Sequence, residues 1–168
     1  HHFDAMAGYS WQQFYYKSTE YSYKLSDGAV LKDNKPAGEL FLVSFFGRVN
    51  YTYDNRYMLT ATVRRDGSSK FQGKNRWGLF PSVAFGWNVA NEEFLKDNGV
   101  LTTLKLRLSW GQTGNQAVVG NYDSQATYYK NMLGSYYMFG GQVYNPITAI
   151  GYNADLRWET ATTWNAGI

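Results

Sequence analysis

The sequence predicts an all-β fold, an antiparallel up-and-down transmembrane β-barrel segment holding about six strands of a larger barrel. Three observations lead to this prediction. Apolar and polar residues alternate along several runs, aromatic residues reach 18% while charged residues reach only 17%, and long polar connections alternate with short ones. Because successive side chains of a strand point to opposite faces, each run has one apolar and one polar face.

The clearest pair of strands covers residues 43–53 and 57–63. Apolar residues and Gly47 fill the odd positions, and polar residues fill most of the even ones. Asp54 and Asn55 stand between the two runs and tolerate the backbone angles of a tight turn. This stretch is therefore predicted to be a β-hairpin.

The same alternation predicts further strands over residues 3–12, 77–89, 104–111 and 158–168. Pro81 cannot donate to a ladder, so we expect either a bulge there or a strand that pairs fully only from Ser82.

The connections are expected to be long over residues 13–39, 65–76 and 111–156, and short elsewhere. The first can be a loop or a strand extension with a polar tip. Residues 91–95 read as a helical turn capped by Asn91, with Glu92 and Glu93 in solvent. Residues 111–115 read as a flexible exit from a strand.

Aromatic residues are predicted to gather at both ends of the apolar face, as in the girdles of membrane barrels. One end carries Tyr51, Tyr53, Tyr57 and Trp87, and the other carries Trp11, Trp77, Trp110 and Trp158.

Composition excludes several function classes. There is no cysteine, hence no disulfide and no thiolate metal site. No cluster has metal-ligand spacing, no cofactor is indicated, and no nucleophile with a base is recognisable, so the chain is not expected to be an enzyme. No apolar run is long enough for a transmembrane helix. A net charge of +3 is too small for a nucleic-acid partner, and the basic stretch 64–76 is interpreted as an outer loop held by local salt bridges and facing anionic lipid headgroups.

Four stretches, read in order, resemble the SusC/RagA-type TonB-dependent outer-membrane transporters: FFGRVNYTYDNRYMLTATVRRDGSSKF (45–71), NRWGLFPSVAFGWNVANEEFL (75–95), LKLRLSWGQTGNQ (104–116) and LRWETATTWNAGI (156–168). The resemblance implies a barrel of about 22 strands around a plug. Residues 1–168 would form part of that barrel, with the plug domain and barrel termini absent.

The resemblance also implies a function and partners. The whole protein would import oligosaccharides or peptides across the outer membrane of a Gram-negative bacterium. Its partners would be a SusD-like surface lipoprotein, the TonB complex through segments absent from this sequence, and outer-membrane lipid.

The polar face, which becomes the lumen in a barrel, holds the candidate ligand-binding residues. They can contact substrate or hydrogen-bond to the plug. Aromatic side chains in residues 13–23 and 122–144 can stack on sugar rings, pack within loops, or contact the lid protein. The four lumen candidates are Arg48, Arg64, Lys105 and Arg107.

A second interpretation is a secreted soluble β-sandwich that binds carbohydrate. Alternation alone allows it, because a sandwich also has one dry and one wet face. Aromatic residues at both ends of one apolar face and alternating loop lengths argue against it.

Overall fold

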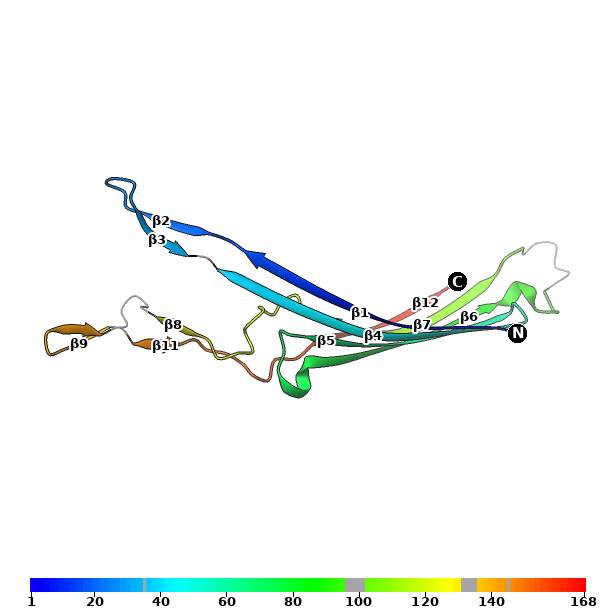
Figure 1. Ribbon diagram of the computed structural model, residues 1–168. Helices are drawn as coiled ribbons and strands as arrows, with labels where there is room; N and C mark the ends of the chain where they lie inside the picture. The colour runs from blue at the N-terminus through cyan, green and yellow to red at the C-terminus, as the bar shows by residue number, and fades with distance from the viewer. Residues whose placement is uncertain (35, 96–101, 131–135, 145) are drawn as a thin grey trace.

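The computed structural model describes residues 1–34, 36–95, 102–130, 136–144 and 146–168. Its main element is a six-stranded antiparallel sheet in the order β1-β4-β5-β6-β7-β12 (Figure 1). This confirms the predicted fold class. The strands are β1 (His2–Lys17), β4 (Ala37–Tyr53), β5 (Tyr57–Ser68), β6 (Trp77–Asn88), β7 (Lys105–Asn115) and β12 (Glu159–Gly167).

Short hairpins and strand pairs extend the sheet at one end (Figure 1). β2 pairs with β3 and prolongs the β1–β4 hairpin, while β10 pairs with β9 and β11 with β8. Figure 1 places the N-terminus at the opposite end. The bounds are β2 (Glu20–Tyr23), β3 (Val30–Asn34), β8 (Tyr128–Lys130), β9 (Tyr137–Phe139), β10 (Gln142–Tyr144) and β11 (Ile147–Ala149), with 3-10 helices η1 (Gly73–Arg76) and η2 (Val89–Asn91).

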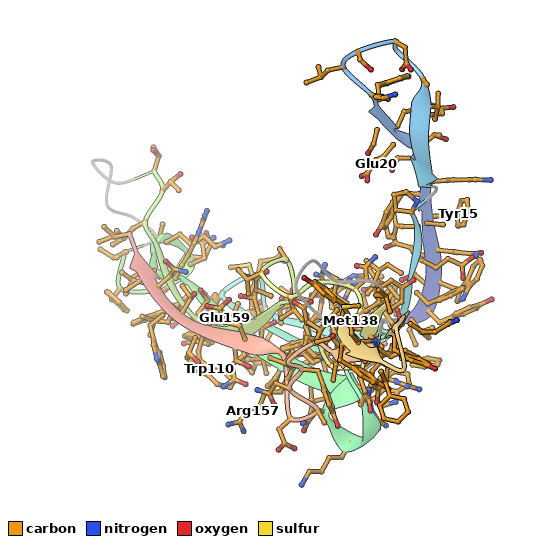
Figure 2. The ribbon with its side chains drawn as sticks, turned by 90° about the vertical axis from the view of Figure 1, so that its left-hand side faces the viewer. Tyr15, Glu20, Trp110, Met138, Arg157 and Glu159 are labelled. Carbon is orange, nitrogen blue, oxygen red and sulfur yellow. The ribbon has the colours of Figure 1, made fainter. Side chains whose placement is uncertain are left out.

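The register places the apolar side chains of neighbouring strands side by side. Tyr51 pairs with Leu59, and Leu59 pairs with Phe85, so three strands contribute apolar residues to one row. The sheet curves into a trough, with Tyr15 and Trp110 labelled on its outer side (Figure 2). We call the outer, apolar side the convex face and the inner, polar side the concave face.

The strands run further than the alternation predicted. β5 continues to Ser68, so the polar loop before β6 shrinks to residues 69–76. Residues 13–17, 20–23, 30–34 and 37–39 lie in strands, so the strand-extension alternative is confirmed for these residues. Residues 111–115 continue β7 instead of forming a flexible exit. The connection 89–104 is longer than 69–76, so the predicted alternation of loop lengths is wrong at this pair.

Pro81 causes no bulge. It pairs with Val63 in an unbroken β5–β6 register, whereas the β6–β7 ladder begins at Ser82. Pro81, which has no N–H, therefore stands where β6 has no partner on its β7 side. The expectation that the strand pairs fully only from Ser82 is confirmed on that side.

The prediction of a helical turn over residues 91–95 is confirmed in part and its Asn91 cap is wrong. A turn is present, because the Leu95 N–H donates to the Glu92 carbonyl at 3.0 Å. A 3-10 turn covers Val89–Asn91 and ends where the Glu92 N–H donates to the Val89 carbonyl at 3.0 Å. The Asn91 side chain donates instead to the Asn55 carbonyl at 3.0 Å, across the neighbouring turn. The Asn91 side chain therefore makes a tertiary contact instead of the helix cap that the local sequence predicted.

A small core lies under the 69–76 loop and is the most buried part of the described chain. Phe71 is fully buried, and its ring packs against Trp158 with centroids 5.3 Å apart. Phe80 meets Trp158 from another side at 5.4 Å. The core therefore ties this loop to the segment before β12, and we call these three residues the loop core.

Polar contacts complete this region. The buried Lys70 ammonium donates to the carbonyls of Gln116 and Val119 at 3.1 and 2.5 Å. The Ser124 hydroxyl donates to the Lys70 carbonyl at 2.6 Å. The loop was predicted to be held by local salt bridges, but its buried cation is held by backbone carbonyls instead. Among the described residues of the basic stretch 64–76, the local ion pair is Arg64–Asp66.

No helix in the described residues is long and apolar enough to cross a membrane. The sandwich interpretation requires a second sheet packed on the apolar face. In the part of the chain that the structure describes, the six-stranded sheet is a single layer whose apolar side chains stay exposed. The sandwich interpretation is therefore wrong.

Candidate functional site on the concave face

The concave face is built from the even positions of β4, β5 and β6 and the odd positions of β7. Asn50 sits at its centre, donating to the Asp4 carboxylate at 3.1 Å and accepting from the Thr60 hydroxyl at 2.9 Å. These contacts join three adjacent strands through their side chains. The face is therefore a hydrogen-bonded polar surface.

Arg48 and Arg64 lie on adjacent strands of this face. Arg48 pairs with Thr62 in the register and donates to its hydroxyl at 3.2 Å. The Arg64 Nε–H donates to both carboxylate oxygens of Asp66, at 2.7 and 2.9 Å, and the Arg64 Nη2 donates to the buried Ser44 hydroxyl at 3.0 Å. Arg64 is thus committed to a local ion pair, whereas most of the Arg48 guanidinium is open to the lumen side.

Lys105 and Arg107 lie two residues apart on β7 and share the concave face. The Lys105 ammonium is 3.4 Å from the Met58 sulfur. Arg107 is exposed and makes no hydrogen bond or ion pair with another described residue. Of the four candidates it presents the most available donors.

The structure does not bring the four basic candidates together. Arg48 and Arg64 form one pair and the β7 residues form another, with β6 between them. β6 presents only small side chains on this face there, Ser82, Ala84 and Gly86, and a shallow depression of about 310 Å³ runs between Met58 and the β7 pair. The arrangement can receive an extended polar or anionic group along β6.

Aromatic side chains crowd the hairpins at the same end as the loop core. Tyr137 and Tyr144 stack across the β9–β10 hairpin with centroids 5.3 Å apart and planes at 15°. Tyr21 lies 6.1 Å from Tyr23 on β2. Exposed parallel rings are suited to stacking against sugars or peptide side chains. Tyr122 instead ties its loop to β4, since its hydroxyl accepts from the Glu39 N–H at 3.1 Å.

The sequence missed a carboxylate cluster at the opposite end of the sheet. Glu92 was expected in solvent, but it is buried and accepts from the Tyr57 hydroxyl at 2.7 Å, the Trp87 indole at 2.9 Å and the Arg56 guanidinium at 3.0 Å. The hydrogen bonds from Tyr57, Trp87 and Arg56, in that order of effect, lower the pKa of Glu92 below its usual value. Asp54, which also pairs with Arg56, adds to this cluster, which we call the turn clamp.

The predicted aromatic girdles are partly confirmed. Tyr57 stacks on Trp87 at 6.3 Å at one end, and Phe45 stacks on Trp77 at 6.1 Å at the other. The prediction that Trp110 lies in the girdle at the second end is wrong, because Trp110 pairs with Val83 in the middle of its strand. Trp158 is also misplaced, since it belongs to the loop core and its indole donates to the Arg76 carbonyl at 3.1 Å.

In the described residues, no group of three or more His, Asp or Glu side chains is placed to hold a metal ion. The turn clamp has carboxylates, but both face cationic or neutral donors of the protein itself. Its geometry is that of a structural cluster.

An exposed apolar convex face, a polar concave face and antiparallel strands define the chain as a segment of a transmembrane β-barrel. The family model "TonB dependent receptor-like, beta-barrel" matches residues 2–168. The chain therefore belongs to the TonB-dependent receptors, in their SusC/RagA-type group. Members of this family are transporters, in agreement with the expectation that the chain is not an enzyme.

Individual relatives agree with this assignment. The chain is 42% identical to the TonB-dependent receptor SusC of Bacteroides thetaiotaomicron over 99% of its own length and 17% of SusC. It is 37% identical to the TonB-dependent receptor P3 of Formosa agariphila, covering 18% of that protein. The RagAB peptide importer in its open-open state superposes with a TM-score of 0.80 at 28% identity, over 98% of this chain and 19% of that one. The chain thus spans about a fifth of the length of these relatives.

Proposed function

We propose that residues 1–168 are part of the barrel domain of an outer-membrane TonB-dependent transporter of a Gram-negative bacterium. The observation that carries the proposal is the inverted polarity of the sheet. Leu59 and Val63 on the convex face are 44% and 46% exposed, while the concave face carries a hydrogen-bonded polar network. Such a sheet is stable where lipid covers the first face and a polar lumen contacts the second. The plug and the other strands belong to the rest of the protein.

The proposed cargo is an oligosaccharide or a peptide, taken up with a SusD-like surface lipoprotein and energised through the TonB complex. Support for an organic solute comes from the stacked tyrosines of the β9–β10 hairpin and from the exposed Arg107 in the lumen. In this proposal the hairpins face the lipoprotein and the outer medium. Arg48, Lys105 and Arg107 line the route, and Arg64 holds the wall in shape.

Cysteine accessibility in the full-length receptor, in native outer membranes, tests the orientation. Cysteines at Val49, Leu59 and Leu106 should react with a lipid-soluble maleimide and resist a water-soluble one, because they share the convex face. Cysteines at Asn50, Thr60 and Arg107 should show the opposite preference once the cells are permeabilised. Equal labelling of both sets by the water-soluble reagent would contradict the proposal.

Uptake in the living cell tests the cargo. Charge removal at Arg107 (Arg107→Gln) should lower uptake of the growth-supporting oligosaccharide or peptide without lowering the amount of receptor in the membrane. Lys17→Gln is the matched control, because it removes the same charge from the convex side of β1. Equal uptake by both variants would remove Arg107 from the route.

A further inference from the structure

The convex face has an apolar depression in the middle of the sheet. Its volume is about 600 Å³ and its lining is almost wholly apolar. It exists because small side chains occur in two adjacent rows where the neighbouring rows carry large ones. The convex-face residues that form it include Ala5, Ala7, Gly47, Ala61, Val63 and Pro81.

A cation stands at the outer rim of this depression. Arg65 occupies the next row, paired with Phe45 and with Leu79, both exposed apolar residues of the convex face. Its guanidinium lies 5.0 Å from the ring centroid of Trp77. No hydrogen bond or ion pair joins Arg65 to another described residue. The one acid of its own strand, Asp66, lies on the concave face and is paired with Arg64, so an arginine among lipid-facing residues calls for an anion from outside the sheet.

More positive charge lies beside it in the 69–76 loop. Lys74 is exposed, and Arg157 approaches from the segment before β12, which is fixed to the loop by the Trp158 indole on the Arg76 carbonyl. Figure 2 shows Arg157 on the outer side of the trough, close to this loop. Of the nearby acids, Asp66 is engaged by Arg64, and Glu159 accepts a hydrogen bond from the Asn115 side chain at 2.8 Å. Asp155 is a further exposed carboxylate in the segment before β12.

From this geometry we propose that the convex face binds one phosphate-bearing lipid of the outer leaflet. The phosphate contacts Arg65, with Lys74 and Arg157 around it, and one acyl chain lies in the depression below. The spacing fits, because the first row of the depression is two residues from Arg65, about 7 Å along the strand. The inference rests on the proposed position of the convex face in the membrane.

The two halves of the site have different roles. An acyl chain gains little from leaving other chains, so the depression selects by close packing rather than by the hydrophobic effect. The phosphate supplies the affinity, since basic side chains at a membrane surface attract anionic headgroups. Trp77 holds the guanidinium at interface level, where aromatic residues of barrels gather.

Native mass spectrometry of the full-length receptor in detergent, titrated with phosphatidylglycerol, tests the proposal. Arg65→Gln should weaken binding of the first lipid about fivefold, the effect of about one basic residue at a membrane surface. Arg107→Gln, which removes the same charge from the concave face, should leave it unchanged. Diacylglycerol with the same acyl chains should bind the wild type no better than it binds Arg65→Gln.

A second pair of variants tests the depression. Ala61→Phe fills it and should weaken phosphatidylglycerol binding, whereas Leu59→Phe, one row outside it, should not. If Ala61→Phe fails to fold, Ala7→Leu fills the same space from the next row. Unchanged binding by Arg65→Gln, equal loss with Arg107→Gln, or equal behaviour of the two Phe variants would overturn the inference. Because cysteine labelling tests the membrane orientation separately, the inference can fail while the proposed function stands.

Discussion

The Arg56 guanidinium and the Glu92 carboxylate meet at 3.0 Å across the end of the sheet. One residue closes the β4–β5 hairpin and the other begins the connection after η2. Tyr57 and Trp87 bond to the same carboxylate. The turn clamp therefore joins the β4–β5 turn to the β6–β7 connection.

The turn clamp makes stability depend on pH in a defined window. Because hydrogen bonds lower the pKa of Glu92 in the folded state, its contribution is fully present above the ordinary value of 4.5 and is lost as pH falls through the lowered pKa. Glu92→Gln should lower the urea midpoint of the full-length receptor at pH 7, and its difference from wild type should shrink as pH drops below 4.5. Glu93→Gln, at an exposed neighbour, is the control. A deficit that stays constant at acid pH would show that the carboxylate charge is irrelevant.

The sequence predicted the sheet because its signal is local. Alternation of apolar and polar residues along most of the β4–β5 hairpin, interrupted by Asp54-Asn55, predicts both the strands and their register. Alternation could not predict the turn clamp, because two of the Glu92 partners, Arg56 and Tyr57, are 36 and 35 residues away in sequence. An acid near the end of a strand is equally typical of a solvated link.

The loop core was missed for the same reason. Phe71 stands among Gly, Ser and Lys in a stretch with no period, so its sequence predicts a polar loop. Phe71 is buried because Trp158, from the segment before β12, packs against its ring. The candidate lumen residues were predicted only from their alternate positions along the strands. Alternation shows which face a side chain lies on, but it does not show that Arg64 forms an ion pair with Asp66 while Arg107 is exposed.

The β4–β5 turn has a left-handed backbone conformation that Asp and Asn tolerate. Asp54 and Asn55 both have φ of 50°, and the Arg56 N–H donates to the Tyr53 carbonyl at 2.9 Å. Asn55→Val should cost about 1–2 kcal/mol, because a β-branched residue is strained at positive φ. Asn55→Gly should be neutral or slightly stabilising. Urea midpoints of the two variants would measure this, and equal midpoints would contradict it.

The loop core should control the order of the outer loops. Phe71→Ala removes a fully buried ring that packs on Trp158, at a cost of about 3–5 kcal/mol. The 69–76 and 153–158 segments should then become sensitive to protease in intact cells, while the strands stay protected. Phe139→Ala removes a ring that is 73% exposed and should leave the cleavage pattern of these segments unchanged. Cleavage of wild type and Phe71→Ala at the same rate would show that the core does not hold these loops.

Trp77 lies across Gly67, and this contact positions the aromatic girdle near the loop core. The two residues pair in the β5–β6 register, and a Cβ at Gly67 would lie 2.9 Å from the Trp77 ring, too close for any real contact. Gly67→Val should therefore push the indole off the strand and break its contact with Arg65, at a cost of about 1–3 kcal/mol for overpacking. A shift of tryptophan fluorescence, measured on a receptor whose other tryptophans are replaced by Phe, would report the displaced ring. Gly47→Val is the control, since the nearest atom to a Cβ there is 3.8 Å away; the same shift in both variants would mean that Gly67 has no special role.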